Sequence, residues 1–327
     1  MNGDVTVIVP VWNGRRLLEP LFGGLRAQTR VPAEVIVVDD GSADGSAELA
    51  ERLGARTIRM PAHGGFAPAV NRGIRESRTP LVAIVNDDVR LAPGWIEKLA
   101  AALSPDVWFA TGRILAAASP DRIDGTYDLL CRGGTPWRVG YGMADGPEFR
   151  QPRRIWSAPM TAALFRAALF EKAGLLDERF ESYLEDVDFG VRCALAGCAG
   201  WYVPEAVAWH QGSATLGRWH PDSVRMMARN QVLLIAKYYS PRMLVRYAWP
   251  ILVAQSLWGL VAMRHGRTWS WLRGKAAGLR RGLEFRPGRY PDWPLAEDER
   301  ELRRLQRAGG QDLYWRLYFL LTAGGAK

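Results

Sequence analysis

Short apolar runs alternate with segments of helical spacing along the first third of the chain. The runs are rich in β-branched residues and end in polar residues, which is typical of buried parallel strands. They cover residues 6–11, 35–38, 55–59, 81–85 and 107–111. Segments predicted to be helical lie between them, at residues 14–28, 44–53, 68–77 and 93–103. Because this alternation implies right-handed crossovers, we predict an α/β fold with a mostly parallel central sheet flanked by helices.

Residues 116–156 interrupt this alternation. They are rich in Gly, Pro and Arg, so we predict a long loop. Long loops of this kind usually carry substrate contacts.

The overall composition is that of a globular protein. A chain of 327 residues, 48% of them hydrophobic, can bury one large core or two smaller ones. Its three cysteines, Cys131, Cys193 and Cys198, are an odd number without metal-type spacing. This pattern argues against a disulfide framework or a zinc site and is typical of a reducing cytoplasm. The N-terminus lacks the basic and apolar regions of a secretory signal, so we expect no export.

The positive charge of the chain is concentrated near its C-terminus. Residues 241–290 contain ten Lys and Arg against one acid, a difference of +9 that equals the net charge of the whole chain. The same stretch holds four tryptophans and an apolar run, residues 247–263, bounded by Arg246 and Arg264. Such a pattern is typical of a helix that lies in a membrane interface. A nucleic-acid site would not contain seventeen nearly uncharged residues, so we expect no nucleic-acid partner.

The apolar run at residues 247–263 has two other interpretations. Seventeen residues are near the lower length limit for a transmembrane helix, and Pro250, Gln255 and Ser256 weaken that interpretation. A helix buried in the protein core, with arginines at its ends, is the other alternative. We favour the interfacial helix.

Acidic clusters are the most informative polar feature of the chain. They are Asp39-Asp40, Asp87-Asp88, Asp177-Glu178 and Glu185-Asp186 with Asp188. The first two clusters follow predicted strands, and open α/β sheets bind ligands at the carboxyl ends of their parallel strands. Carboxylates gathered there repel one another unless a cation or a reaction needs them. A divalent metal that holds a phosphate is the simplest such need.

Each of these motifs also has an ordinary structural interpretation. Asp39-Asp40-Gly41-Ser42 has the residues of a turn and helix N-cap, and Asp87-Asp88 those of a solvated strand-end turn. Asp188 and Arg192 have the spacing of an ion pair on a helix. In the functional interpretation, one carboxylate of residues 185–188 faces a cleft as a general base. His210 is either a histidine at a strand end or a metal ligand.

Taken together, the motifs resemble the glycosyltransferases of family 2, which have a GT-A type nucleotide-sugar-binding fold. The resemblance runs from Thr6 to about Gly217, roughly two thirds of the chain. It is carried by Val7-Ile8-Val9-Pro10-Val11-Trp12-Asn13, Val37-Val38-Asp39-Asp40-Gly41-Ser42, Gly65-Phe66 with Asn71-Arg72-Gly73, Asn86-Asp87-Asp88-Val89, and residues 176–180 with 183–188. Trp209-His210-Gln211-Gly212-Ser213 is further similar to the bacterial rhamnosyltransferase branch.

This resemblance implies a domain organisation and a reaction. Residues 1–217 would form a GT-A type catalytic domain, with a nucleotide-binding half of about 1–113 and an acceptor half of about 114–217. Residues 218–327 would form a helical, basic and apolar region associated with the membrane. The implied reaction is an inverting, metal-dependent transfer of a sugar, rhamnose from dTDP-rhamnose being the expected donor, with Mg²⁺ or Mn²⁺ as cofactor.

The resemblance also assigns roles to individual residues. Asp186 would be the catalytic base that removes the proton of the acceptor hydroxyl. The residues that would bind the donor are Pro10, Asp39, Asp40, Asn71 and Asp87. Asp88 and His210 would hold the metal. Supporting residues on the acceptor side would be Glu185, Asp188 and Arg192. His63 departs from the pattern, because the family often has an amide before Gly-Phe, so nucleotide contacts can differ there.

The expected partners follow from the same resemblance and from the basic tail. We expect a nucleoside diphosphate sugar, a glycan or polyprenyl-linked glycan acceptor, and an anionic membrane surface at the cytoplasmic, inner face of the cell membrane. Such an enzyme would act in cell-envelope polysaccharide synthesis. Two alternatives remain: a nucleotidyltransferase, for which the sequence lacks a Gly-rich phosphate loop near the first strand, and a binding or scaffold protein without turnover. The oligomeric state stays open.

Overall fold

A computed structural model describes residues 3–212, 219–285, 295–310 and 312–323. The chain forms two compact units. The first unit comprises residues 1–128 and 140–215, and the second comprises residues 129–139 and 216–327. Residues 129–139 therefore lie inside the predicted catalytic region of residues 1–217 but belong to the second unit. Each unit is described by itself.

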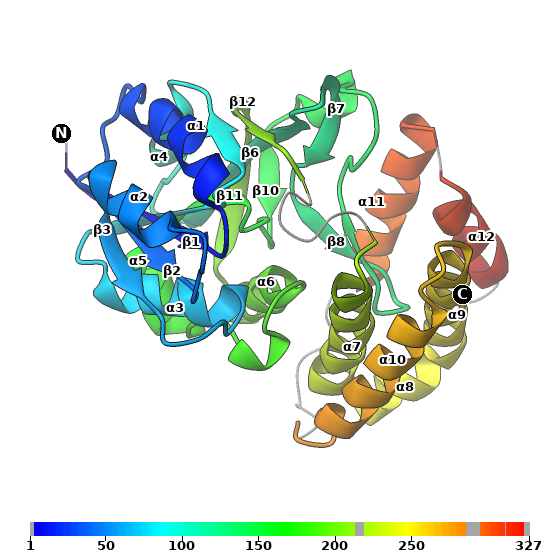
Figure 1. Cartoon of the computed structure of the whole chain (residues 1–327). Coiled ribbons are helices and arrows are strands. Elements are labelled where there is room, and N and C mark those ends of the chain that lie inside the picture. The colour runs from blue at the N-terminus through cyan, green and yellow to red at the C-terminus, as the bar shows by residue number, and fades with distance from the viewer. Residues whose placement is uncertain (1–2, 213–218, 286–294, 311, 324–327) are drawn as a thin grey trace. The chain divides into compact units, whose positions relative to one another are not determined.

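The first unit is built around one large twisted sheet (Figure 1). Its first four strands in space are parallel and in the order β3-β2-β1-β4. Their bounds are β1 Val5–Val11, β2 Glu34–Asp39, β3 Arg56–Arg59 and β4 Leu81–Val85. These strands agree with the predicted apolar runs, and the α/β fold is confirmed. The parallel order is explained by the helices that return the chain between successive strands.

Beyond β4 the sheet is mixed. β11 (Ala162–Arg166) lies antiparallel between β4 and β6 (Val107–Ala116), and β12 (Ala199–His210) lies parallel to β6. Two further strands, β10 (Arg153–Ile155) and β5 (Val89–Leu91), pair antiparallel with β12. β7 (Ser119–Gly125) pairs antiparallel with β6. The sheet is thus parallel in its first half and mixed in its second.

Helices cover both faces of this sheet because side chains of a strand point alternately to opposite faces. The odd-numbered residues of β1 pack in one core with α1 (Arg15–Arg26) and α4 (Trp95–Ala101). On the other face, Ile8 meets α3 (Phe66–Glu76) so closely at Gly73 that a Cβ there would lie 2.4 Å from it. The remaining helices of this unit are α2 (Ser46–Arg52), α5 (Ala167–Ala173) and α6 (Glu185–Leu195), with short 3₁₀ turns at Pro147–Phe149 and Glu178–Phe180.

The prediction of a long loop at residues 116–156 was wrong. This segment contains β7, β8 (Asp128–Leu130), β9 (Pro136–Arg138) and β10. β7 has the sequence Ser-Pro-Asp-Arg-Ile-Asp-Gly, and most of its side chains are exposed or half-buried. An edge strand needs little apolar sequence, because it pairs on one side and is solvated on the other. The polar composition of residues 116–156 therefore concealed its strands.

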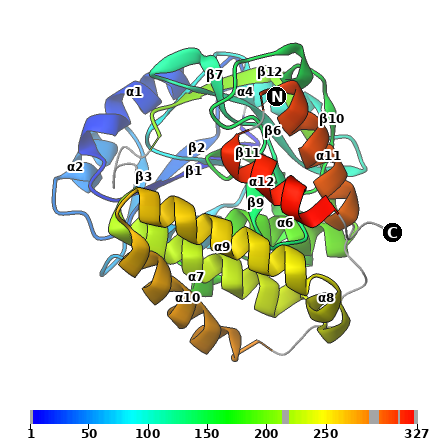
Figure 2. The same cartoon turned by 90° about the vertical axis from the view of Figure 1, so that its right-hand side faces the viewer.

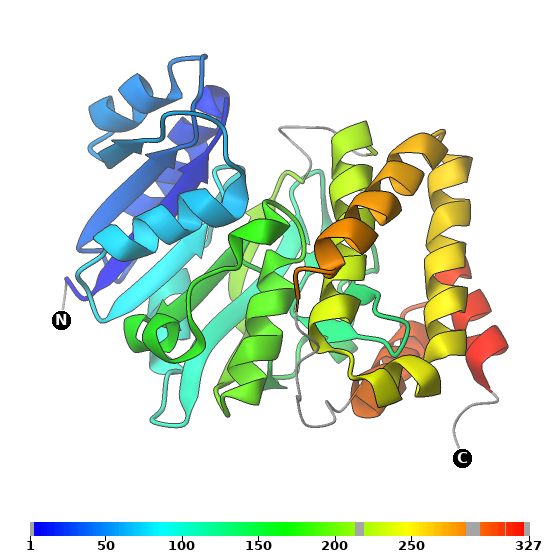
Figure 3. The same ribbon diagram turned by 90° about the horizontal axis from the view of Figure 1, so that it is seen from below.

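The second unit is helical apart from the pair β8-β9. Its helices are α7 (Pro221–Tyr238), α8 (Pro241–Arg246), α9 (Ala248–Arg264), α10 (Thr268–Gly282), α11 (Leu295–Ala308) and α12 (Leu313–Thr322). α7 and α10 lie side by side, as Figures 2 and 3 show. Among the helices described, none combines the length and the apolar composition that a membrane crossing requires.

Acidic side chains of α11 hold residues 129–139 in the second unit. Asp298 accepts a hydrogen bond from the backbone N–H of Leu130 at 3.1 Å, and Glu299 accepts one from the N–H of Arg132 at 2.9 Å. Glu299 also pairs with the Arg132 guanidinium at 2.6 Å and accepts the hydroxyl of Tyr318 at 2.8 Å. All four side chains are almost fully buried, so this ion pair is satisfied by further hydrogen bonds, as a buried charge requires.

Candidate active site

Asp39 is the last residue of β2 and Asp40 follows it, at the carboxyl edge of the parallel strands, and both are buried. The carboxylate of Asp40 accepts the backbone N–H groups of Gly64 and Gly65 at 2.9 and 2.8 Å. Asp40 therefore orders the loop that leads into α3. Asp39 Oδ1 is a buried acceptor that has no hydrogen-bond partner in the described part of the chain. A buried acceptor without a partner is costly, and a ligand N–H or hydroxyl would satisfy it.

His63 joins Asp40 to an aromatic stack. Its Nδ1 lies 2.8 Å from Asp40 Oδ2, and its ring lies on that of Trp12, with centroids 4.0 Å apart and planes inclined by 17°. The side chain of His63 is 47% exposed, so one part of the stack faces solvent. Trp12 and His63 thus present a flat, aromatic surface beside the two acids of β2, which suits the stacking of a planar ring.

The turn before α6 packs on the start of α3. The N–H of Ala67 donates to the carbonyl of Glu181 at 2.8 Å, and the N–H of Phe66 donates to Ser182 Oγ at 3.0 Å. Three residues of this turn have positive φ although none is glycine; they are Glu181, Tyr183 and Leu184. Such backbone conformations are strained and persist only where surrounding contacts impose them. The contacts from α3 therefore hold the entrance to α6 in a defined shape.

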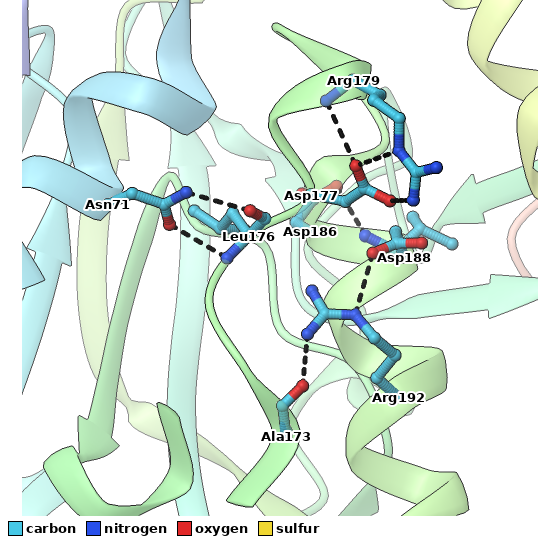
Figure 4. A network of polar contacts seen from close by, with 9 residues as sticks. Asn71, Ala173, Leu176, Asp177, Arg179, Asp186, Asp188 and Arg192 are labelled. Atoms are coloured by element: carbon cyan, nitrogen blue, oxygen red, sulfur yellow. Dashed lines mark hydrogen bonds and ion pairs between the residues drawn. The ribbon is translucent and has the colours of Figure 1, made fainter. Parts of the chain in front are cut away.

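α6 begins with the predicted acidic cluster, Glu185, Asp186 and Asp188, and all three side chains are buried. Asp186 Oδ1 accepts the N–H of Val187 at 2.9 Å, which orients the carboxylate (Figure 4). Asp188 pairs with Arg192 at 3.0 Å, so the predicted ion pair is confirmed. Arg192 also donates to the carbonyl of Ala173. The ion pair of Asp188 and Arg192 therefore stabilises α6 and attaches it to the end of α5.

Asn71, which is predicted to contact the donor, binds the segment that precedes α6. Its side chain is buried, its Nδ2 donates to the carbonyl of Leu176, and its Oδ1 accepts the N–H of Leu176, both at 2.9 Å (Figure 4). Nδ2 also donates to Glu178 Oε1 at 2.9 Å. The amide is thus used in holding residues 176–178 against α3. Asp177 next to it binds the backbone and guanidinium of Arg179 and caps the 3₁₀ turn at Glu178–Phe180. Pro10, another predicted donor residue, lies in β1 opposite Val38 of β2.

Asp87 and Asp88 follow β4, as predicted, and both carboxylates are buried. Burial raises the pKa of Asp87 to about 8, and the neighbouring negative charge of Asp88 adds to the increase. Gly14, just before α1, lies against this carboxylate: a Cβ at Gly14 would be 1.9 Å from Asp87 Oδ2. Only a residue without a side chain leaves room for Asp87 at this position.

His210 lies between two carboxylates. Its Nε2 is 3.1 Å from Asp88 Oδ1, and its Nδ1 is 2.7 Å from Asp124 Oδ2. Burial alone would lower the pKa of His210, but the hydrogen bonds and charges of Asp124 and Asp88 outweigh it and raise this pKa to about 10. The pairing of β5 with β12 explains the arrangement, because it places His210 opposite Val89, the residue after Asp88.

Asp124 is the site residue that the sequence did not reveal. It lies in β7, within the segment predicted to be a loop, and no neighbouring motif distinguishes it from other surface acids. Its contact with His210 depends on a strand pairing between residues far apart in the sequence.

The chemistry of Asp88 and His210 fits a divalent cation. Carboxylate oxygen and imidazole nitrogen are ligands for Mn²⁺, and Mg²⁺ usually takes one or two carboxylates and completes its shell with phosphate oxygens and water. Across the described residues, no three or more His, Cys, Asp or Glu side chains are grouped as a ready-made metal site. The protein would therefore supply few ligands, and a diphosphate would supply the others.

Comparison with known proteins gives a family match and several relatives. The sequence model described as "Glycosyl transferase family 2" matches residues 6–172. N-acetylglucosaminyl-diphospho-decaprenol L-rhamnosyltransferase of Mycobacterium tuberculosis is 28% identical over 251 residues, which cover 67% of this chain and 79% of that protein. Pre-mycofactocin glycosyltransferase of the same organism is 30% identical over 221 residues, covering 66% of this chain and 44% of that protein.

Two solved structures share the fold. A mannosyltransferase from Pyrobaculum calidifontis, in complex with GDP-Man and Mn²⁺, has a TM-score of 0.54 at 18% identity and covers 99% of this chain and 85% of its own. GalNAc-T7 with UDP, GalNAc and Mn²⁺ has a TM-score of 0.61 at 13% identity, covering 98% of this chain and 56% of its own. The fold of the first unit is thus the GT-A type.

Proposed function

The chain belongs to glycosyl transferase family 2, and from this premise we propose that it moves a sugar from a nucleoside diphosphate to a lipid-linked glycan, with inversion and with the help of a divalent metal. The donor that we propose is dTDP-rhamnose, with rhamnose as the transferred sugar. One observation above all supports the transfer reaction. Buried carboxylates gather at the carboxyl ends of β2 and β4, in the unit whose α6 also begins with buried acids.

The donor nucleoside would bind at the end of β2. Asp39 offers a buried acceptor there, and Asp40 fixes the loop at Gly64 and Gly65 beside it. Asp87 would accept a ribose hydroxyl. Asp88 and His210 would hold Mg²⁺ or Mn²⁺, which neutralises the negative charge of the departing diphosphate when bound.

Asp186 would act as the general base. Its carboxylate sits in the first turn of α6, where the N–H of Val187 fixes its orientation and the braced turn at residues 181–184 fixes its position. A carboxylate held in this way can accept the proton of an acceptor hydroxyl as that hydroxyl attacks the anomeric carbon. Attack from the face opposite the diphosphate inverts the configuration. Asp188 and Arg192 are occupied with each other and would support this position, with Glu185 beside them.

The proposed acceptor is a polyprenyl-linked glycan of the cell envelope. The name of the mycobacterial rhamnosyltransferase contains a decaprenol-linked N-acetylglucosamine, and that protein matches two thirds of this chain. A lipid-linked acceptor lies in a membrane. We therefore place the enzyme at the inner face of the cell membrane, which is consistent with the excess of +9 in residues 241–290.

Binding of nucleotide sugars by the purified full-length protein tests this function. The panel contains dTDP-rhamnose, UDP-sugars and GDP-sugars, each with Mn²⁺, Mg²⁺ or a chelator. We expect one donor to bind in a metal-dependent manner and to be hydrolysed slowly without acceptor, and we expect Asp88→Asn to weaken both. A folded protein that binds none of these donors would contradict the proposal and favour a scaffold without turnover.

A further inference from the structure

We propose that the outer side of α8, α9 and α10 is a docking surface for an anionic lipid bilayer. This proposal rests on the proposed function, because it explains how the enzyme meets a lipid-linked acceptor.

α9 carries an apolar stripe that remains more than half exposed in the second unit, although the indole N–H of Trp249 donates to the carbonyl of Leu321. Trp249, Leu252, Leu260 and Met263 are 55%, 58%, 54% and 56% exposed. Their spacing of 3, 8 and 3 residues places them on one side of the helix, and Ser256 occupies the intervening turn. The opposite side of α9 is packed, with Val253, Ala254, Leu257 and Ala262 buried. The helix is thus half-embedded in its own unit and open on the other side.

The neighbouring helices continue this apolar exposure. Val245 of α8 is 81% exposed, and Trp269 and Leu279 of α10 are 73% and 66% exposed. Soluble proteins rarely leave so many large apolar side chains in water on adjoining helices, and such patches mark interaction surfaces.

Charge identifies the partner. Residues 241–283 contain no Asp or Glu. Five arginines of α8, α9 and α10 are exposed, namely Arg242, Arg246, Arg264, Arg273 and Arg280. A second copy of the chain on this surface would bring like charges together, which opposes association. An anionic bilayer instead attracts the arginines and takes up the apolar stripe, so that α9 lies along the membrane surface.

Sedimentation of the full-length protein with vesicles tests this surface. The vesicles contain phosphatidylcholine alone or with phosphatidylglycerol, and bound protein is measured at low and high salt. We expect binding only to the anionic vesicles, weakened by salt. The pair Leu252→Ser and Leu260→Ser should reduce the affinity about tenfold or more, because the apolar contribution is lost. Arg264→Gln with Arg273→Gln should reduce binding without touching the stripe.

Val31→Ser is the matched control, because Val31 is a 49% exposed apolar residue of the first unit. The proposal is overturned if the leucine and arginine variants bind anionic vesicles as tightly as the unchanged protein does. It is also overturned if gel filtration shows that the unchanged protein is a dimer and that the leucine pair dissociates it. Donor hydrolysis is measured on the same samples. Donor hydrolysis by a protein that does not bind vesicles would refute the docking surface but not the proposed function.

A separate observation carries a second inference: the geometry points to Asp124 as the residue that positions His210. The pairing of β7 with β6 shifts in register: Gly125 pairs with Ile114, and Ile123 pairs with Leu115. Asp124 is therefore an extra residue of β7 without a partner position on β6. Extra residues of this kind redirect side chains and are frequent beside active sites. Asp124 reaches His210 Nδ1 at 2.7 Å.

This contact determines which nitrogen of His210 can bind a metal. A carboxylate accepts hydrogen bonds and does not donate them, so Nδ1 carries the hydrogen that bridges to Asp124. Nε2, which faces Asp88, is then the nitrogen at which a cation can replace the hydrogen. Backbone hydrogen bonds fix the main chain at both residues: the N–H of Ala117 donates to the carbonyl of His210, and the N–H of Gln211 donates to the carbonyl of Asp88.

Manganese affinity tests the role of Asp124. Mn²⁺ binding to the full-length protein is measured by calorimetry in the presence of UDP, GDP or dTDP. We expect Asp124→Asn to weaken Mn²⁺ binding about 10- to 100-fold, the usual effect of losing a residue that orients a metal ligand. Asp121→Asn is the matched control, because Asp121 lies on the same strand and is exposed. Asp124→Glu, which keeps a carboxylate, should recover part of the affinity.

Equal Mn²⁺ affinity in Asp124→Asn and the unchanged protein would overturn this second inference and leave the metal-dependent function intact. Absence of Mn²⁺ binding in the unchanged protein would overturn both the role of Asp124 and the proposed metal dependence. Thermal unfolding of each variant shows whether a lost affinity comes with a lost fold.

Discussion

The imidazole of His63 binds Asp40 through Nδ1 at 2.8 Å, so that a residue outside the family pattern is fixed to one within it. Asp40 is also the acceptor for Gly64 and Gly65. The same imidazole stacks on Trp12. These contacts join the ends of β1 and β2 to the loop before α3, where the donor nucleoside is proposed to bind.

Replacing His63 should therefore weaken nucleotide binding. We expect His63→Ala to lower the affinity for the donor nucleoside diphosphate about tenfold, because Asp40 loses one charge-assisted partner and Trp12 loses its stacking partner. His63→Asn restores the amide that the family often has, and we expect it to recover part of the loss. Calorimetry with the preferred nucleotide measures both variants. Unchanged affinity in His63→Ala would show that this stack lies outside the donor site.

The general base gives the sharpest kinetic prediction. Asp186→Asn keeps the size and most hydrogen bonds of the side chain but removes its ability to take a proton. We expect nucleotide affinity to stay within about twofold, while transfer falls by two to four orders of magnitude. Single-turnover assays with a labelled donor measure the two quantities separately. Retained transfer would move the base to Glu185 or Asp188, and Asp188→Asn is the comparison that discriminates between them.

Much of this site was predictable because its residues follow apolar runs directly in sequence. Asp40, Asp88 and Asp186 lie where the strand and helix boundaries predicted them. Asp124 could not be predicted, since its role depends on a register shift in an edge strand. The resemblance predicts a donor contact for Asn71, and the structure adds that its amide holds Leu176 and Glu178, which the sequence did not indicate. Sequence places a residue near a site, but only the packing shows which of its polar atoms are already occupied.

A substitution at Gly14 tests whether the position of the Asp87 carboxylate matters for donor binding. A methyl group at Gly14 would come within 1.9 Å of Asp87 Oδ2, so Gly14→Ala must displace the carboxylate or the start of α1. We expect the variant to lose about 1–3 kcal/mol of stability and to bind the donor several-fold more weakly. Gly23→Ala is the matched control in the interior of α1, where a Cβ has no neighbour within 4 Å. That change should stabilise the protein by about 0.5–1 kcal/mol. Equal melting temperatures in the two variants would contradict the predicted clash.

The sequence was less informative about the edges of the sheet than about its centre. β1, β2 and β4 are buried on both faces and therefore appear as continuous apolar runs. β7 and β10 are edge strands in a Gly-, Pro- and Arg-rich segment, so their sequences do not carry that signal. The attachment of residues 129–139 to α11 depends on buried acids, Asp298 and Glu299, that meet the chain about 168 residues away. Local patterns do not encode such contacts.

Lys275 makes the stability of the protein depend on pH in a defined window. Its ammonium group lies in α10, 3.0 Å from Gln231 Oε1, and it also contacts Gln255 Oε1. Burial lowers the pKa of Lys275 to about 7 from its ordinary value of 10.5. Between pH 7 and 10.5 the folded state therefore binds fewer protons at this site than the unfolded state, so the contribution of Lys275 makes the protein more stable as pH rises.

Replacing Lys275 should remove this rise. We expect Lys275→Met to be more stable than the unchanged protein near pH 6, where charging the buried amine is unfavourable, and to lose that advantage by pH 10. The difference is on the order of a few kcal/mol at its largest. Urea unfolding at several pH values measures it, and Lys98→Met, at an exposed lysine of α4, is the control. Parallel pH profiles for Lys275→Met and the unchanged protein would show that Lys275 stays charged in the folded unit.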